Sequence, residues 1–190
     1  MARLVLHGHH RSGNHWLAAL ISTNFYGKDD YRFLLNSRQH GLTSCIAPCV
    51  RYIYIERNFM DVAKSVFAMR ARFGLDVDSF EVFLETPYRQ MYTGQLAVDL
   101  ETNFICEQGG SRSSSLFFRG IDETPEGWHK RHLEHHHRVF EGKDNCLIVS
   151  YDALKQDLNA EMTRIAEFTE SDLREFKPIE SRVGFFPREQ

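Results

Sequence analysis

The sequence predicts a three-layer α/β/α fold around a central parallel sheet of about four to five strands. Short apolar runs typical of strands occur along the chain, helical patterns follow two of them, and a glycine-bracketed loop joins the first run to the first helical pattern. Continuous apolar runs of this length suit parallel strands that are buried on both faces. The expected strands are residues 4–7, 31–35, 52–56 and 146–150.

Helical patterns lie between and after these strands. The first expected helix places Leu17, Leu20 and Ile21 on one side. Asn58 is expected to cap the second helix, with Asp61 three residues later as in a capping box. The expected helices are residues 16–25, a helix beginning after residue 58, and residues 80–84, 88–100, 128–140 and 157–168.

One domain is expected over residues 1–190, because the length suits a single core and no repeat or clear linker divides the chain. Within this domain, residues 74–126 are a candidate acceptor-site or lid region, since the glycine and serine run at 109–115 is typical of a flexible loop. A plain surface loop explains the same run equally well.

The composition is that of an ordinary globular protein, with 42% hydrophobic residues, 26% charged residues and a formal net charge of −3. This near balance of charge argues against a nucleic-acid partner. Every apolar run is much shorter than the stretch of about 20 residues that spans a bilayer. The amino end lacks the long apolar segment of a signal peptide. We therefore expect a cytoplasmic protein with no membrane partner, and the sequence leaves its oligomeric state open.

The sequence predicts no metal site. The four cysteines lack the close paired spacing of a zinc site, and small buried apolar residues explain them better. His132 and His136 are one helical turn apart, a spacing that two metal ligands could use, but no third ligand is evident. A solvated helix face is the expected setting of these two histidines.

The loop between the first strand and the first helix has the pattern of a phosphate-binding loop. Gly8 and Gly13 have the glycine spacing of a nucleotide P-loop, but Asn14 and His15 replace the lysine and the hydroxyl residue that should follow. Such a loop still presents backbone N–H groups and a helix N-terminus to an anion. We therefore expect a P-loop-like fold that binds phosphate without hydrolysing a nucleoside triphosphate.

Cations follow two of the expected strands. Arg11 lies inside the loop and Arg57 follows the strand at 52–56, with Ser65 about two helical turns later. Ligands of open α/β sheets bind beyond the carboxyl ends of the strands. His40 and Tyr151 also follow expected strands, and the two cations Arg11 and Arg57 predict a ligand with more than one anionic group.

Three blocks of the sequence resemble the cytosolic sulfotransferases that use 3'-phosphoadenosine 5'-phosphosulfate (PAPS). Residues 9–17 align without a gap with the family's Tyr-Pro-Lys-Ser-Gly-Thr-Thr-Trp-Leu loop. Residues 57–65 match its 3'-phosphate signature at the Arg, Asn, Asp and Ser positions, in register. Tyr151 and Asp152 resemble a third block, in which a tyrosine and an acidic residue end a strand.

The resemblance implies a role for each matched residue. Arg11 stands where a lysine contacts the bridging oxygen of the departing sulfonate. Residues 38–40 resemble a family Lys-Thr-His segment, so that His40 is the candidate base for the acceptor hydroxyl. The implied donor contacts are the backbone of Ser12, Gly13, Asn14 and His15 at the 5'-phosphate, Trp16 and Tyr151 at the adenine, and Arg57 and Ser65 at the 3'-phosphate.

Several positions depart from the family pattern. Arg11 keeps the charge of the family's lysine but does not readily give up a proton, so we expect it to stabilise developing negative charge. Asn14 and His15 replace threonines. The family's carboxyl-terminal Arg-Lys-Gly block corresponds to residues 182–184, which makes Arg182 and Gly184 candidate contacts to the 3'-phosphate.

The predicted reaction is metal-free transfer of a sulfonate from PAPS to a hydroxyl or amine of an acceptor, which is a small molecule, a glycan or a peptide. One alternative is a P-loop nucleotide kinase or hydrolase, which would depend on Mg²⁺. Another is a non-catalytic relative, which would bind adenosine 3',5'-bisphosphate without transferring a group.

Overall fold

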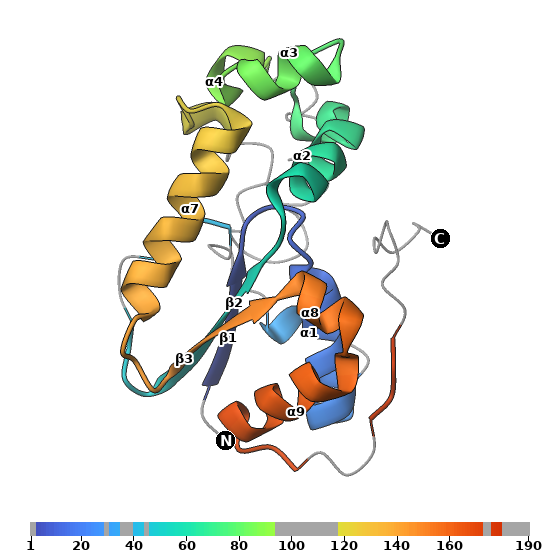
Figure 1. Cartoon of the computed structure of the whole chain (residues 1–190), viewed down its shortest axis with the longest axis vertical. Helices are drawn as coiled ribbons and strands as arrows, with labels where there is room; N and C mark the ends of the chain where they lie inside the picture. Colours follow the sequence, from blue (N-terminus) through green and yellow to red (C-terminus); the bar gives the residue numbers. More distant parts are fainter. Residues whose placement is uncertain are drawn as a thin grey trace. The chain divides into compact units, whose positions relative to one another are not determined.

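The computed structural model describes residues 3–28, 31–34, 40–43, 46–93, 118–172 and 176–179 (Figure 1). The chain divides into two compact units, one of Met1–Arg57 with His135–Gln190 and one of Asn58–Glu134. The expected glycine and serine loop at 109–115 and most of the expected helix at 88–100 lie outside the described residues.

The first unit contains a parallel sheet in the order β1-β2-β3, formed by β1 (Arg3–Gly8), β2 (Val50–Glu56) and β3 (Cys146–Ser150). Three of the four expected strands are therefore confirmed, and the described residues hold three strands where four to five were expected. The register pairs Gly8 with Ile55 and Ile55 with Val149. The carboxyl ends of the three strands consequently meet at one edge of the sheet.

One face of this sheet packs against three helices (Figure 1). These are α1 (Asn14–Ile21), α8 (Tyr151–Gln156) and α9 (Leu158–Thr169). Because side chains alternate along a strand, Leu6, Ile53 and Val149 share this face and join one hydrophobic core with the helices. The core supplies the first two layers of the predicted fold.

The opposite face packs against the end of α7 (Pro125–Phe140), whose residues from His135 onward belong to the first unit. Tyr52 and Tyr54 of β2 contact the ring of Phe140, and His136 stacks on Tyr54. The predicted three-layer α/β/α architecture is therefore confirmed. The expected solvated setting of His132 and His136 is wrong, since both side chains are 0% exposed.

The expected strand at 31–35 is wrong, because Arg32–Leu34 form a 3₁₀ helix, η2. Phe33 is 49% exposed and lies edge-on to Tyr26, whereas Leu34 enters the core. The apolar run thus reflects a local aromatic contact and one core residue, not a strand buried on both faces. The expected helix at 16–25 is α1 followed by a π-helix, η1 (Ser22–Tyr26).

The second unit is helical. It contains α2 (Phe59–Ala68), η3 (Arg70–Phe73), α3 (Phe80–Glu85), α4 (Tyr88–Met91), η4 (Phe118–Gly120) and the start of α7. Asn58 caps α2 as expected, since its side chain accepts a hydrogen bond from the backbone N–H of Met60 at 2.9 Å. Tyr88 packs against Phe83 and Phe118 in the core of this unit.

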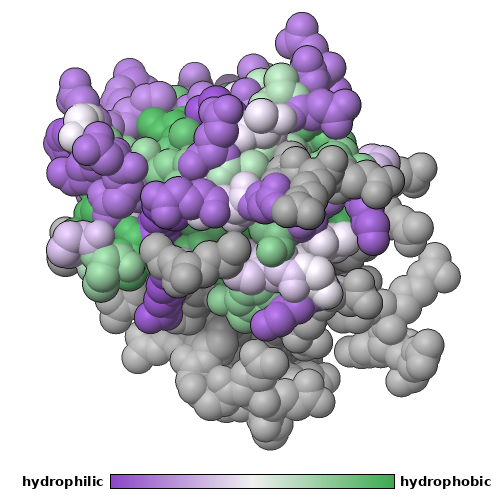
Figure 2. Space-filling view, turned by 90° about the horizontal axis from the view of Figure 1, so that it is seen from below, coloured by the Kyte–Doolittle hydropathy of each residue, from purple (hydrophilic) through white to green (hydrophobic). Residues whose placement is uncertain are grey.

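The face shown in Figure 2 carries many hydrophilic side chains with hydrophobic ones between them. Among the helices that the structure describes, none has the length and apolarity needed to cross a membrane.

Several buried polar side chains lie on β1 and the loop after it, at His7, His9, His10, Ser12 and Asn14. The buried polar groups point to this loop as the functional region.

Candidate functional site

The loop from Gly8 to Gly13 reverses the chain between β1 and α1. Arg11 (φ 66°) and Gly13 (φ 109°) both have left-handed backbones, which is uncommon for a residue other than glycine. The backbone N–H and the hydroxyl of Ser12 both donate to the carbonyl of His9, at 3.1 and 2.6 Å. The first N–H groups of a helix have no partner within the helix, so the start of α1 could bind an anion.

Both glycines of the loop are required by close packing. A Cβ atom at Gly8 would lie 2.5 Å from Oδ1 of Asn14 and 2.8 Å from a side-chain carbon of Ile55. A Cβ atom at Gly13 would lie 2.6 Å from the ring of Tyr151. The glycine spacing seen in the sequence is thus explained by side chains that pack against the backbone of the loop.

Arg57, at the carboxyl end of β2, reaches this loop. Its guanidinium Nη1 donates to the backbone carbonyl of Arg11 at 3.1 Å. Its Cζ atom lies 4.2 Å from the ring centroid of Tyr151. The two arginines that the sequence analysis placed at neighbouring strand ends are therefore in contact through the backbone of Arg11.

His40 also contacts the loop. Its Nδ1 lies 2.9 Å from the carbonyl oxygen of Gly8, and its ring centroid is 3.9 Å from that of His10. The short distance to a carbonyl assigns the proton of the neutral ring to Nδ1 and leaves a lone pair on Nε2. Burial lowers the pKa of His40 to about 4; the bond to Gly8 acts in the opposite direction, and His15 and Arg11 lower it further. The imidazole is therefore neutral near pH 7.

Asn14 has a position that the sequence did not reveal. Its side chain is 2% exposed and its Nδ2 donates to the carbonyl of Gly8 at 3.2 Å, beside His40 Nδ1 at 3.3 Å. Gly8 O thus accepts from both Asn14 and His40. The amide that replaces the family's threonine turns back to the end of β1 and braces the loop.

The two aromatic residues assigned to the adenine lie in the core of the first unit. Nε1 of Trp16 donates to the carbonyl of Ile179 at 2.8 Å, and its ring is edge-on to that of Tyr151 at 5.3 Å between centroids. Both side chains are buried. His15 is half-buried, with Nδ1 at 3.4 Å from the hydroxyl of Tyr31. The roles of these residues at a nucleotide stay predictions.

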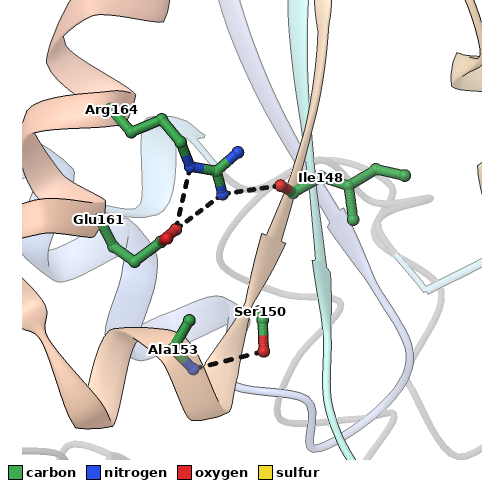
Figure 3. Close-up of polar contacts among 5 residues, drawn as sticks. All are labelled: Ile148, Ser150, Ala153, Glu161 and Arg164. Atoms are coloured by element: carbon green, nitrogen blue, oxygen red, sulfur yellow. Dashed lines mark hydrogen bonds and ion pairs between the residues drawn. The ribbon is translucent and has the colours of Figure 1, made fainter.

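Tyr151 is fixed by the junction between β3 and α8. The hydroxyl of Ser150 accepts from the N–H of Ala153 and caps α8, which begins at Tyr151 (Figure 3). Arg164 of α9 donates to the carbonyl of Ile148 at 2.9 Å and to the carboxylate of Glu161 at 2.7 Å (Figure 3). These contacts tie the helix pair to the end of β3 and hold the tyrosine beside the loop.

A second polar cluster, not found from the sequence, holds the segment 40–43. The hydroxyl of Thr43 lies 3.1 Å from Nδ1 of His7, and Nε2 of His135 donates to the carbonyl of Thr43 at 2.6 Å. Burial lowers the pKa of His7 to about 4, and nearby His40 lowers it further. The histidine-rich segments at 7–10 and 135–137 were the only available signal, because the partners are distant in sequence.

The remaining candidate residues lie outside the described part of the first unit. Ser65 lies half-buried on α2, in the second unit. Arg182 and Gly184 lie outside the described residues, as do residues 38 and 39 before His40. Among the residues that the structure describes, no group of three metal-ligating side chains could hold a metal ion.

Comparison with known proteins identifies the family. A solved structure described as mouse sulfotransferase SULT7A1 complexed with PAP resembles the chain with a TM-score of 0.49 and 16% sequence identity. The match covers 91% of this chain and 59% of that protein's chain, so the chain spans less than two thirds of its length. No curated protein matches the chain. The model of the sulfotransferase domain matches residues 37–183, which include Arg57 and Tyr151, and because this match spans most of the sequence the chain belongs to the sulfotransferase family.

Proposed function

We propose that this protein transfers a sulfonate from PAPS to a hydroxyl or amine of an acceptor. The observation that carries the proposal is the meeting of Arg57, the loop 8–13 and His40 at the carboxyl edge of the sheet. Two cations, backbone N–H groups at a helix start and a neutral imidazole are the groups that this chemistry needs. The acceptor is a small molecule, a glycan or a peptide.

The donor set suits a nucleotide with two separated anionic groups. Arg11 and the start of α1 would bind the 5'-phosphate and the transferring group, and Arg57 would bind the 3'-phosphate. Preorganised donors of this kind stabilise charge that moves onto the leaving phosphate, and they act without a metal ion. Arg11 stays protonated throughout and acts by its charge.

His40 would remove the proton of the acceptor. Its Nδ1–H is engaged by the carbonyl of Gly8, so the lone pair on Nε2 is the basic site. As the acceptor oxygen bonds to sulfur, its proton passes to Nε2, and the bond between sulfur and the bridging oxygen of the 5'-phosphate breaks. Such base catalysis typically contributes ~10²–10⁴ in rate. Anionic phosphates beside the ring would raise the pKa of His40 from about 4 toward neutrality and strengthen the base.

Asn14 argues against the alternative of a P-loop kinase or hydrolase. Asn14 follows Gly13 at the position where a P-loop has a lysine. It has no ammonium group to bind terminal phosphates, and its amide donates to the carbonyl of Gly8. Such enzymes also need a hydroxyl for Mg²⁺, and His15 follows instead. The arrangement favours a nucleotide held by arginines without Mg²⁺.

Thermal unfolding tests the donor. We expect adenosine 3',5'-bisphosphate to raise the melting temperature in the absence of metal, and ATP with Mg²⁺ to raise it less, because only a ligand of the folded state adds stability. A transfer screen with ³⁵S-labelled PAPS and pooled acceptors then tests the chemistry. His40→Ala is the matched variant: it should keep nucleotide binding and lose transfer. Preferential stabilisation by ATP with Mg²⁺ would contradict the proposal.

A further inference from the structure

Tyr151 is the residue on which three parts of the candidate site converge. Its ring packs against the backbone of Gly13, carries the guanidinium of Arg57 at 4.2 Å and meets the edge of Trp16 at 5.3 Å. Only 7% of the side chain is exposed. Little ring surface is left for a further aromatic group, although the family resemblance assigns this tyrosine to the adenine.

The contact with Arg57 is well suited to orienting a cation. A guanidinium stacks on an aromatic face because the ring quadrupole attracts it and because both groups are planar. Nη1 of the same guanidinium donates to the carbonyl of Arg11, so the ring and the carbonyl together fix the side chain. A side chain held in this way loses less conformational freedom when it binds a phosphate.

We propose that Tyr151 is a positioning residue for Arg57. Its ring holds the guanidinium against the loop in the orientation that receives the 3'-phosphate of the donor, and it thereby determines the preference for a 3'-phosphorylated nucleotide. The inference rests on the proposed function. It differs from a direct contact with adenine, which would stabilise nucleotides with and without a 3'-phosphate equally.

The test compares the binding of adenosine 3',5'-bisphosphate and adenosine 5'-monophosphate by calorimetry. The wild type should prefer the bisphosphate. Tyr151→Phe, which keeps the ring, should retain that preference. Tyr151→Leu should weaken bisphosphate binding roughly tenfold and leave monophosphate binding within about twofold, because a lost cation–π contact acts through Arg57 alone. Arg57→Gln should reduce the same preference, and adding Tyr151→Leu to it should change little further.

A buried leucine in place of tyrosine can unfold a protein, so a second substitution keeps the ring shape. Trifluorophenylalanine at position 151 packs like phenylalanine but withdraws electrons from the ring face, and it should lower the bisphosphate preference relative to Tyr151→Phe. Equal weakening of both nucleotides, or an unchanged preference in all ring variants, would overturn the inference and leave the proposed function standing. A wild type that does not prefer the bisphosphate would overturn both.

Discussion

The imidazole of His136 stacks on the phenol ring of Tyr54, with ring centroids 4.3 Å apart and planes inclined by 3°. This pair joins the end of α7 to the middle strand of the sheet, and the ring of His7 lies 5.9 Å from the same histidine. Burial, and to a lesser extent Glu56, raise the pKa of Tyr54 far above its ordinary range, so its hydroxyl stays protonated. Tyr54 therefore packs against His136 as a neutral aromatic ring.

His136→Ala should lower the free energy of unfolding by about 2–4 kcal/mol, because it leaves a cavity beside Tyr54 in a closely packed layer. Urea denaturation measures the change. The matched control is His137→Ala on the same helix, since His137 is half exposed and bonds Glu56 at 2.7 Å. A surface pair of this kind contributes about 0–1 kcal/mol. Equal effects of the two substitutions would refute the packing role.

Acid should destabilise the fold before the carboxylates titrate. Burial lowers the pKa of His7 and His40 from 6.5 to about 4, so between these values the unfolded chain binds protons that the folded chain does not. The free energy of unfolding should then fall with decreasing pH by about 1.4 kcal/mol per pH unit for each histidine.

Denaturation midpoints at about pH 7, 6 and 5 test this dependence on the titration of the two histidines. His7→Asn removes one titrating ring. The free energy of unfolding of this variant should therefore depend less steeply on pH than that of the wild type. Identical slopes for the two proteins would show that His7 does not titrate differently on folding.

Gly13→Ala should disrupt the loop. The new Cβ atom would lie 2.6 Å from the Tyr151 ring, at a backbone φ of 109° that disfavours a side chain. We expect a loss of more than about 2 kcal/mol of stability and a matching loss of nucleotide binding. Gly27→Ala is the control, because Gly27 also has a positive φ (61°) but its Cβ would meet no atom within 4 Å. Comparable effects at both positions would show that backbone strain alone is responsible.

Thr43→Val should slow sulfonate transfer several-fold without changing nucleotide affinity, since the hydroxyl at Nδ1 of His7 helps to hold the segment that carries His40. Thr43→Ser keeps the hydroxyl and should restore the rate. Single-turnover transfer with labelled donor provides the rate, and calorimetry provides the affinity. A serine variant as slow as the valine variant would assign the effect to packing of the methyl group.

Local sequence signals predicted three of the four expected strands and the Asn58 cap of α2. The strand at 4–7 and the loop after it are defined by adjacent residues, and Asn58 caps α2 through a residue two positions away. The strand predicted at 31–35 is wrong because apolar residues in a short segment do not reveal whether they pair in a sheet or pack on neighbouring aromatic rings. Periodicity also could not show that His132 and His136 of the polar helix α7 are buried, or that His136 stacks on Tyr54.

The roles of the candidate site residues stay predictions, and the sequence did not reveal the contacts between these residues. The sequence indicated Arg11 and Arg57 because each follows an expected strand, and His40 through the family resemblance of residues 38–40. It could not indicate that Tyr151 contacts Arg57, or that Asn14 and His40 share one acceptor, because such contacts depend on the register of the sheet and on side-chain direction. Residues far apart in sequence are joined only by the fold.

The carbonyl oxygen of Gly8 has two lone pairs, and both are occupied, one by the amide of Asn14 and one by the ring of His40. Asn14 is also the first residue of α1, whose start is the expected anion-binding point. A phosphate that displaced this helix start would therefore also shift the carbonyl oxygen to which the ring of His40 is bonded. Under the proposed function, binding of the donor would thus affect the position of the candidate base.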